Sequence, residues 1–214
     1  MDLRYTDEQV AFRGEVRAWL EANVPRKALP SFDTAEGFEA HREWERTLAQ
    51  GNWGMVTWPE AFGGRGCDLL EWLIFEEEYY RAGAPLRVNQ NGIFLLGPTL
   101  MEYGTPEQKA KYLPEIAAGR LKAAISFTEP GGGTDLLGSL YTTAEKVDGG
   151  WVLNGEKIWS SSAHVADYLL CIARTDKNVE KKHQGLTLFW VSAKSAGVKI
   201  TPLAKLGMRS MGSC

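Results

Sequence analysis

The chain has 214 residues, of which 44% are hydrophobic, 24% charged and 11% aromatic, a globular balance that excludes wholesale disorder. Its 24 basic and 27 acidic residues give a net charge of -3, which argues against nucleic acid as the main partner. No run of about 18 apolar residues predicts a membrane span, and the polar, acidic start lacks the pattern of a signal peptide. We therefore expect a cytoplasmic protein of one large or two modest domains.

Helical patterns fill residues 1–120. Apolar positions recur there at the spacing of an α-helix, and Thr6 and Thr105 each begin a capping box completed by a glutamine three residues later. The third segment is apolar nearly all round, so we expect that helix to be deeply buried, and Pro98 predicts a kink in the fourth. The predicted helices span residues 6–24, 35–50, 68–83, 93–103 and 105–119.

A glycine-rich loop, WPEAFGGRG, spans residues 58–66 between two of these helices. It does not match the phosphate-binding pattern G-x-x-x-x-G-K-S/T, and no apolar strand leads into it. We therefore expect this loop to connect two helices tightly rather than to cradle a phosphate.

Strand patterns replace the helical ones after Arg120. The turn letters DGG at 148–150, between two short apolar runs, predict a β-hairpin. Several short strands with frequent turns predict a small barrel or sandwich. The predicted strands span residues 123–128, 141–147, 151–153, 156–161, 168–173, 186–191 and 198–201. The predicted organisation is α+β: a helical domain over residues 1–120 and a small β-barrel domain over residues 121–214.

The usual catalytic constellations are missing from this sequence. No histidine has metal-ligand spacing to another histidine or to a cysteine, and no C-x-x-C pair occurs. The triple serine 160–162 is not a G-x-S-x-G elbow, and no G-x-G-x-x-G joins a strand to a helix. We therefore expect neither a metal site nor a Rossmann nucleotide site.

Two segments remain as candidates for chemistry. Residues 127–135, FTEPGGGTD, place hydroxyl groups around a glycine loop that allows close backbone approach. Residues 157–161, KIWSS, place the indole of Trp159 on one face of a predicted strand, with hydroxyl groups close by. An aromatic ring packed on a planar cofactor with hydrogen bonds at its edge is the design of a flavin site. The alternative is that Trp159 is a core aromatic and the glycines merely turn the chain.

These segments, taken with others, resemble the acyl-CoA dehydrogenase family. The matching features are the capped first helix and the segments 58–66 (WPEAFGGRG), 103–114 (YGTPEQK with YLP), 127–135 (FTEPGGGTD), 153–159 (LNGEKIW) and 206–209 (LGMR). Each motif is modest, but the ordered set is specific and covers essentially the whole chain. The resemblance implies an N-terminal helical domain and a middle β-barrel domain, which the family follows with a C-terminal four-helix domain.

The family's activity is FAD-dependent α,β-dehydrogenation of an acyl-CoA thioester. The resemblance therefore implies an oligomeric flavoprotein oxidoreductase of fatty-acid and lipid metabolism, with an electron-transfer flavoprotein as electron acceptor. The family's catalytic glutamate belongs to the C-terminal domain, so the resemblance assigns no catalytic residue here, and Glu129 is not given that role. We expect the chain, which ends at Cys214, to be a fragment that retains little flavin alone.

The resemblance also implies site residues. Phe127 and Thr128 would bond the flavin edge, Trp159 would pack on the ring, and Thr134 would contact both flavin and CoA. Ile125 stands where several family members have a tyrosine. The implied cofactor-binding residues are Ile125, Phe127, Thr128, Gly133, Thr134, Trp159, Ser160 and Ser161, and the implied substrate-binding residues are Thr134, Asn91 and Leu95.

Two other functions stay open from the sequence. The chain is alternatively a non-catalytic flavin- or CoA-binding subunit that a partner chain completes. A related flavin oxidase or monooxygenase is a further alternative within the same fold. The acyl group is not readable, because a hydrophobic pocket discriminates by only about 1–3 kcal/mol per methylene through packing details.

Overall fold

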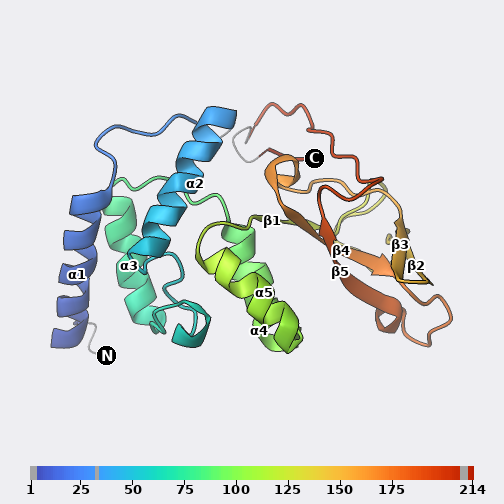
Figure 1. The fold of residues 1–214 in the computed structure, drawn as a ribbon, viewed down its shortest axis with the longest axis horizontal. Coiled ribbons are helices and arrows are strands. Elements are labelled where there is room, and N and C mark those ends of the chain that lie inside the picture. Colours follow the sequence, from blue (N-terminus) through green and yellow to red (C-terminus); the bar gives the residue numbers. More distant parts are fainter. Residues whose placement is uncertain (1–3, 32–33, 208–211) are drawn as a thin grey trace. The chain divides into compact units, whose positions relative to one another are not determined.

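The computed structural model describes residues 4–31, 34–207 and 212–214 (Figure 1). Two members of the last family motif, Met208 and Arg209, lie outside the described residues. The chain divides into two compact units, Met1–Arg120 and Leu121–Cys214. The first is helical and the second contains a mixed β-sheet.

The helical unit confirms the five predicted helices. Its elements are α1 (Asp7–Asn23), α2 (Ala35–Gln50), the short 3-10 helix η1 (Glu60–Phe62), α3 (Leu69–Arg81), the π-helical turn η2 (Gly92–Leu96), α4 (Gly97–Tyr103) and α5 (Pro106–Ala117). Both predicted capping boxes form: the Gln9 amide donates to the Thr6 hydroxyl at 3.3 Å, and the Gln108 amide to the Thr105 hydroxyl at 3.2 Å. Local capping chemistry therefore fixes where these helices begin.

Aromatic side chains of α2, α3 and the loop after α2 fill the core of this unit. Trp53 is 2% exposed and stacks on Phe75, with ring centroids 5.6 Å apart. The indole N–H of Trp44 donates to the Tyr79 hydroxyl at 2.6 Å, so this polar tip is satisfied inside the core. Leu20 of α1 packs into the same cluster. This burial is the main source of stability for the helical unit.

The prediction that the third helix is deeply buried is wrong for one of its faces. On α3, Leu69 is 72% exposed, Leu70 48% and Leu73 46%, whereas Ile74 and Phe75 are fully buried. A sequence that is apolar all round shows that a helix can be covered on every side, but it does not supply the covering element. In this unit one side of α3 lies against α1 and the core, and the other faces outward.

The kink predicted at Pro98 coincides with a π-helical turn directly before that residue. The Gly97 amide bonds to the Gly92 carbonyl, which is the wide spacing of a π-helical turn. Pro98 then stands in the first turn of α4, where its missing N–H is not needed. The chain therefore changes helix type at this point.

The β unit is organised around one strand, β4 (Tyr168–Arg174). It pairs in parallel with β1 (Ala123–Ser126), pairs antiparallel along its length with β5 (Leu186–Ser192), and meets β2 (Thr143–Val147) at a single register position. The predicted hairpin forms between β2 and β3 (Gly150–Asn154), with Gly149 at a φ of 81° in the turn. The 3-10 helices η3 (Ala163–Val165) and η4 (Lys182–Gly185) precede β4 and β5.

Three strand-level predictions differ from the structure. Among the described residues the sheet, β1-β4-β2-β3 with β5 on β4, is not closed, so the structure does not show the expected barrel. The segment 156–161 is not a strand, because Trp159 has a φ of 62°, which breaks the ladder geometry. Residues 198–201 alternate in sequence but pair with no strand in the described part of the chain.

Candidate functional site

The two candidate segments of the β unit lie side by side. The Ile158 amide donates to the Thr128 carbonyl at 2.9 Å, and the Lys157 ammonium donates to the Phe127 carbonyl at 3.2 Å. Two segments separated by about thirty positions are thus joined at their main chains. Phe127, Thr128 and Trp159, which the sequence singled out separately, therefore belong to one place in the fold.

A buried ion pair adjoins the contact between residues 127–128 and residues 157–158. The Lys157 ammonium donates to the Glu129 carboxylate at 2.8 Å, and the side chains are only 10% and 5% exposed. The amides of Tyr141 and Thr142 donate to the same carboxylate at 2.7 and 2.9 Å. Burial would raise the pKa of Glu129, but the hydrogen bonds from Lys157 and from Thr142 and Tyr141 outweigh it and lower that pKa. The carboxylate is thus held by one ammonium and two main-chain amides.

Trp159 is neither a strand residue nor a core aromatic. Its φ of 62° is the left-handed region, which is unusual for a bulky side chain, and the residue is 58% exposed. Both neighbours are held: Ile158 bonds to Thr128, and the Ser160 amide donates to the Cys214 carbonyl at 2.9 Å. The surrounding bonds therefore hold a strained backbone that presents an indole outward.

The two predicted serines differ in their surroundings. Ser160 is buried, and its hydroxyl donates to the hydroxyl of Ser126 on β1 at 3.0 Å. Ser161 is half-buried and forms an isolated β-bridge with Ser213. Within the described part of the chain the Ser161 hydroxyl has no hydrogen-bond partner. Of these two serines, Ser161 is therefore the one whose hydroxyl is available to a ligand.

The glycine loop leaves open space at one predicted position. A Cβ placed on Gly133 would meet no atom within 4 Å, whereas one on Gly132 would lie 2.1 Å from the Ser139 hydroxyl oxygen. Gly132 is therefore required by packing and Gly133 is not. The adjacent Thr134 is exposed, and its hydroxyl has no partner among the described side chains and main-chain groups.

The remaining predicted residues lie elsewhere. Ile125 is half-buried on β1, in register with Leu170 of β4. Asn91 and Leu95 belong to the helical unit, at the start and within the π-helical turn, where Asn91 is half-buried and Leu95 is 51% exposed. The two are four positions apart, close to one turn of a π-helix, so they share a helix face.

Sequence reasoning missed the roles of Lys157, Thr142 and Gly155. A Cβ on Gly155 would lie 2.3 Å from the Thr142 hydroxyl oxygen, so the turn before Lys157 packs closely on Thr142. That hydroxyl is itself buried and has no hydrogen-bond partner among the described residues. The available signal was a lysine directly before the apolar pair Ile158 and Trp159, because a buried ammonium requires an acid partner.

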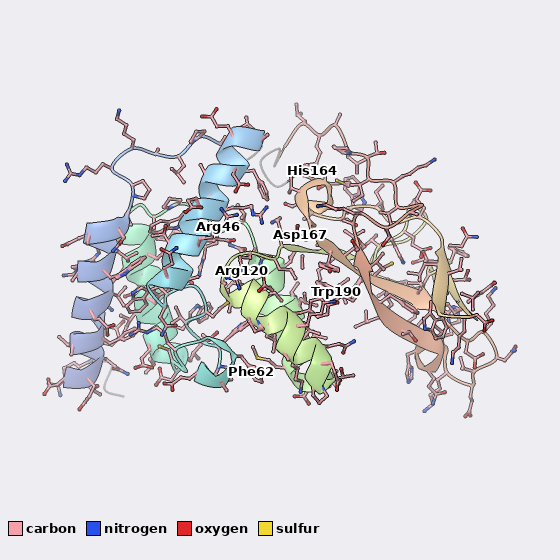
Figure 2. All side chains as sticks on the ribbon, in the orientation of Figure 1. Arg46, Phe62, Arg120, His164, Asp167 and Trp190 are labelled. Carbon is pink, nitrogen blue, oxygen red and sulfur yellow. The ribbon has the colours of Figure 1, made fainter. Side chains whose placement is uncertain are left out.

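Sequence reasoning also missed a hollow of about 890 Å³ in the helical unit, between α2, η1 and α5. It contains none of the predicted site residues. Figure 2 shows Arg46 on α2, Phe62 in η1 and Arg120 after α5, all of which line it. Both arginines already pair with acids: Arg46 with Glu43 at 2.7 Å and Arg120 with Glu115 at 2.7 Å. The two arginines therefore add little uncompensated positive charge to the hollow, which Lys109 also lines.

The described residues contain no group of three or more histidine, cysteine, aspartate or glutamate side chains arranged to hold a metal ion. None of their helices is long and apolar enough to cross a membrane.

The architecture defines the class of the protein: a helical unit followed by a mixed β-sheet unit. The family model described as the acyl-CoA dehydrogenase N-terminal domain matches residues 6–120, and the model of the middle domain matches residues 124–214. The chain belongs to the acyl-CoA dehydrogenase family.

Known proteins agree with this assignment. The acyl-CoA dehydrogenase IpdE1 of Mycobacterium tuberculosis is 39% identical, over 91% of this chain and 52% of its own length. The Tcur3481-Tcur3483 steroid ACAD is 36% identical with a TM-score of 0.82, over 97% of this chain and 53% of that one. The ChsE4-ChsE5 complex from Mycobacterium tuberculosis is 34% identical with a TM-score of 0.79, over 100% of this chain and 53% of that one. The chain thus spans about half the length of the curated relatives it matches.

Proposed function

We propose that this chain supplies the N-terminal and middle parts of an FAD-dependent acyl-CoA dehydrogenase, which introduces an α,β double bond into an acyl-CoA thioester. The observation that carries the proposal is the exposed indole of Trp159 on a left-handed backbone, fixed beside Thr128. When bound, FAD would accept the β-hydrogen of the substrate as a hydride. Membership of the family supports the reaction class.

Three features of the described residues fit an isoalloxazine ring. The indole of Trp159 is open to solvent and can pack on a flat surface. The hydroxyls of Thr128 and Ser161 have no hydrogen-bond partner among the residues that the structure describes, so they can serve the ring's polar edge. Gly133 leaves the space of a side chain beside Thr134, whose hydroxyl would contact both flavin and CoA.

The chain's other assigned residues take supporting roles in the proposal. Ser160 would contribute main-chain position rather than its hydroxyl, because that hydroxyl is bonded to Ser126. Ile125 has no hydroxyl, so it would not make the contact that a tyrosine makes at this position in several family members. Asn91 and Leu95 would line the acyl pocket. The base that removes the α-proton would come from a C-terminal domain outside the matched motifs, since Glu129 is held by Lys157 and two amides.

One observation favours a second function. Two structures similar to this chain are named as pairs, Tcur3481-Tcur3483 and ChsE4-ChsE5. A chain of this kind that is completed by a partner would bind flavin or CoA without supplying the base itself. An electron-transfer flavoprotein is the proposed electron acceptor in the catalytic case.

Flavin titration with matched tryptophan variants tests the proposal. We expect FAD fluorescence to change on adding the chain, with weak affinity, and Trp159→Ala to reduce binding about tenfold, which corresponds to loss of a stacking contact worth about 1.4 kcal/mol. The control is Trp151→Ala, which removes another exposed tryptophan, 44% exposed, from β3 of the same unit. Equal effects of the two substitutions would contradict a flavin site at Trp159.

Anaerobic addition of acyl-CoA then separates the two functions. Bleaching of the bound flavin by the thioester supports the dehydrogenase. Flavin binding without bleaching, restored to bleaching by a partner chain that supplies a base, supports the binding subunit. A chain that binds no FAD at any concentration, alone or with a partner, would overturn both.

A further inference from the structure

We propose that Glu129 and Lys157 form a positioning pair that sets the geometry of Trp159 and of residues 127–128, and thereby the affinity for the flavin. This inference rests on the proposed function for its ligand, but its structural part concerns the protein alone. Neither residue is expected to touch the cofactor: the two side chains are 5% and 10% exposed and bond to each other.

The pair joins three segments of the chain at one point. Lys157 donates to Glu129 and also to the Phe127 carbonyl, at 2.8 and 3.2 Å. Glu129 accepts from the main chain at Tyr141 and Thr142. The segments that carry Phe127 and Trp159 are therefore fixed to each other and to the two residues that lead into β2.

Packing closes these contacts into a ring. The Thr142 amide holds Glu129, and Gly155, two positions before Lys157, lies so close to Thr142 that a Cβ there would be 2.7 Å from the Thr142 Cα. Glu129 contacts Thr142, and Thr142 contacts Gly155. The main chain leads from Gly155 to Lys157, which pairs with Glu129 and closes the ring. A ring of this kind leaves the segment that leads into Trp159 little freedom to shift.

The energetics of a buried ion pair favour a positioning role for Glu129 and Lys157 over a stabilising one. A buried ion pair contributes little net stability, because desolvation of two charges offsets their attraction. The left-handed conformation of Trp159 is costly for a residue with a Cβ, and it persists only when its surroundings over-determine it. The bonds from Lys157 and from the Ile158 amide lie immediately before Trp159, where such constraint is required.

The test compares Glu129→Gln, Lys157→Met and the double variant. We expect each single variant to weaken FAD binding roughly 10- to 100-fold, as for outer-shell partners that orient a ligand contact. We expect the double variant to bind better than Lys157→Met alone, because Lys157→Met leaves an unpaired buried carboxylate. Glu115→Gln, which breaks the exposed pair with Arg120 in the other unit, is the matched control and should leave FAD affinity unchanged.

Hydrogen exchange in the absence of flavin tests the structural part. We expect the Ile158 and Thr142 amides to exchange at least about tenfold faster in the single variants, while amides of the β4–β5 ladder keep their rates. This readout is independent of the proposed function. A wild-type chain that binds no FAD would remove the proposed function, and unchanged Ile158 exchange in the variants would remove the positioning pair.

A merely structural pair gives a different result. The variants would then melt at lower temperature, yet bind FAD with wild-type affinity and exchange Ile158 at the wild-type rate at temperatures where all are folded, and that outcome would overturn the proposal. Should Glu129→Gln fail to fold, Glu129→Asp keeps the charge and withdraws it by one methylene. Faster Ile158 exchange in this variant supports the proposal, and unchanged exchange overturns it.

Discussion

In the helical unit Trp53 is 2% exposed and stacks on Phe75, whereas in the β unit Trp159 is 58% exposed on a backbone with a φ of 62°. The first tryptophan obeys every rule of packing: it is buried, unstrained and surrounded by aromatic rings. The second breaks two of them, since it exposes apolar surface and holds a costly conformation. Local violations of this kind concentrate where a protein contacts something else. The comparison shows that Trp53 stabilises the fold, whereas the rest of the fold stabilises the conformation of Trp159.

The largest expected effect comes from removing the buried tryptophan. Trp53→Ala should lower the free energy of unfolding by about 3–5 kcal/mol, because the side chain leaves a cavity in a fully packed core. Trp159→Ala should change it by less than about 1 kcal/mol, because little of that side chain is packed. Urea unfolding followed by circular dichroism measures both. Similar losses for the two variants would erase the distinction between them.

The two buried carboxylates repeat this contrast in charge. Glu78 of α3 is 2% exposed and accepts from Arg13 and Arg17 of α1, at 2.8 and 3.0 Å, so it ties one helix to another. Glu129 is tied mainly to loops, through Lys157 and two amides. The arginines at Glu78 stabilise the packing of two regular elements, while the contacts of Glu129 define irregular backbone.

Acid should therefore weaken the contact between α1 and α3 that Glu78 makes. The hydrogen bond from Arg17 lowers the pKa of Glu78 from its ordinary value of 4.5 to about 2. Because the folded pKa is the lower one, its stabilisation is complete above about 4.5 and is lost as the pH falls toward 2. Allowing for screening at the half-exposed Arg17, we expect about 2 kcal/mol of the free energy of unfolding to disappear across this window.

The measurement is urea unfolding of the chain and of Glu78→Gln at a series of pH values. The variant should be less stable at neutral pH and should lose less stability between pH 4.5 and 2. Parallel pH curves for the two proteins would show that Glu78 is not the titrating group. Low salt should enlarge the difference, because Arg17 is partly in solvent.

Features that depend on neighbouring residues could be predicted from the sequence, whereas features that depend on distant elements could not. Helix starts were predictable because capping is local: Thr6 and Gln9 decide one boundary within four residues. The hairpin at Gly149 was predictable for the same reason. The exposure of Leu69 was not, because it depends on whether another element covers α3.

The β unit was harder to predict because its features depend on distant partners. The sheet's pairing joins β1 to β4 across more than forty residues, and alternation at residues 198–201 could not show that no strand would receive them. Within the site, the residue types at Phe127, Thr128 and Trp159 were identified from sequence. The left-handed φ of Trp159 was not, since its neighbours Ile158 and Ser160 are held by bonds to residues distant in sequence.

The smallest expected effect isolates that backbone conformation. At an ordinary strand position glycine is less stable than alanine by about 0.5–1 kcal/mol, owing to its greater freedom in the unfolded chain. At Trp159 the sign should reverse, because alanine keeps the Cβ that a left-handed conformation penalises by about 1–2 kcal/mol. We expect Trp159→Gly to exceed Trp159→Ala in unfolding free energy by about 0.5–1 kcal/mol. Both variants lack the indole, so flavin contact does not enter.

Trp151 of β3 supplies the matched pair for this measurement. It is 44% exposed, lies in the hairpin and pairs with Lys146 in ordinary register, so Trp151→Gly should be less stable than Trp151→Ala. The difference between the two positions cancels the unfolded-state entropy of glycine, because both comparisons contain it equally. The same sign at both positions would mean that Trp159 is not strained. Opposite signs would mean that the fold spends stability at the residue whose indole it exposes, as expected of a side chain kept for contact rather than for packing.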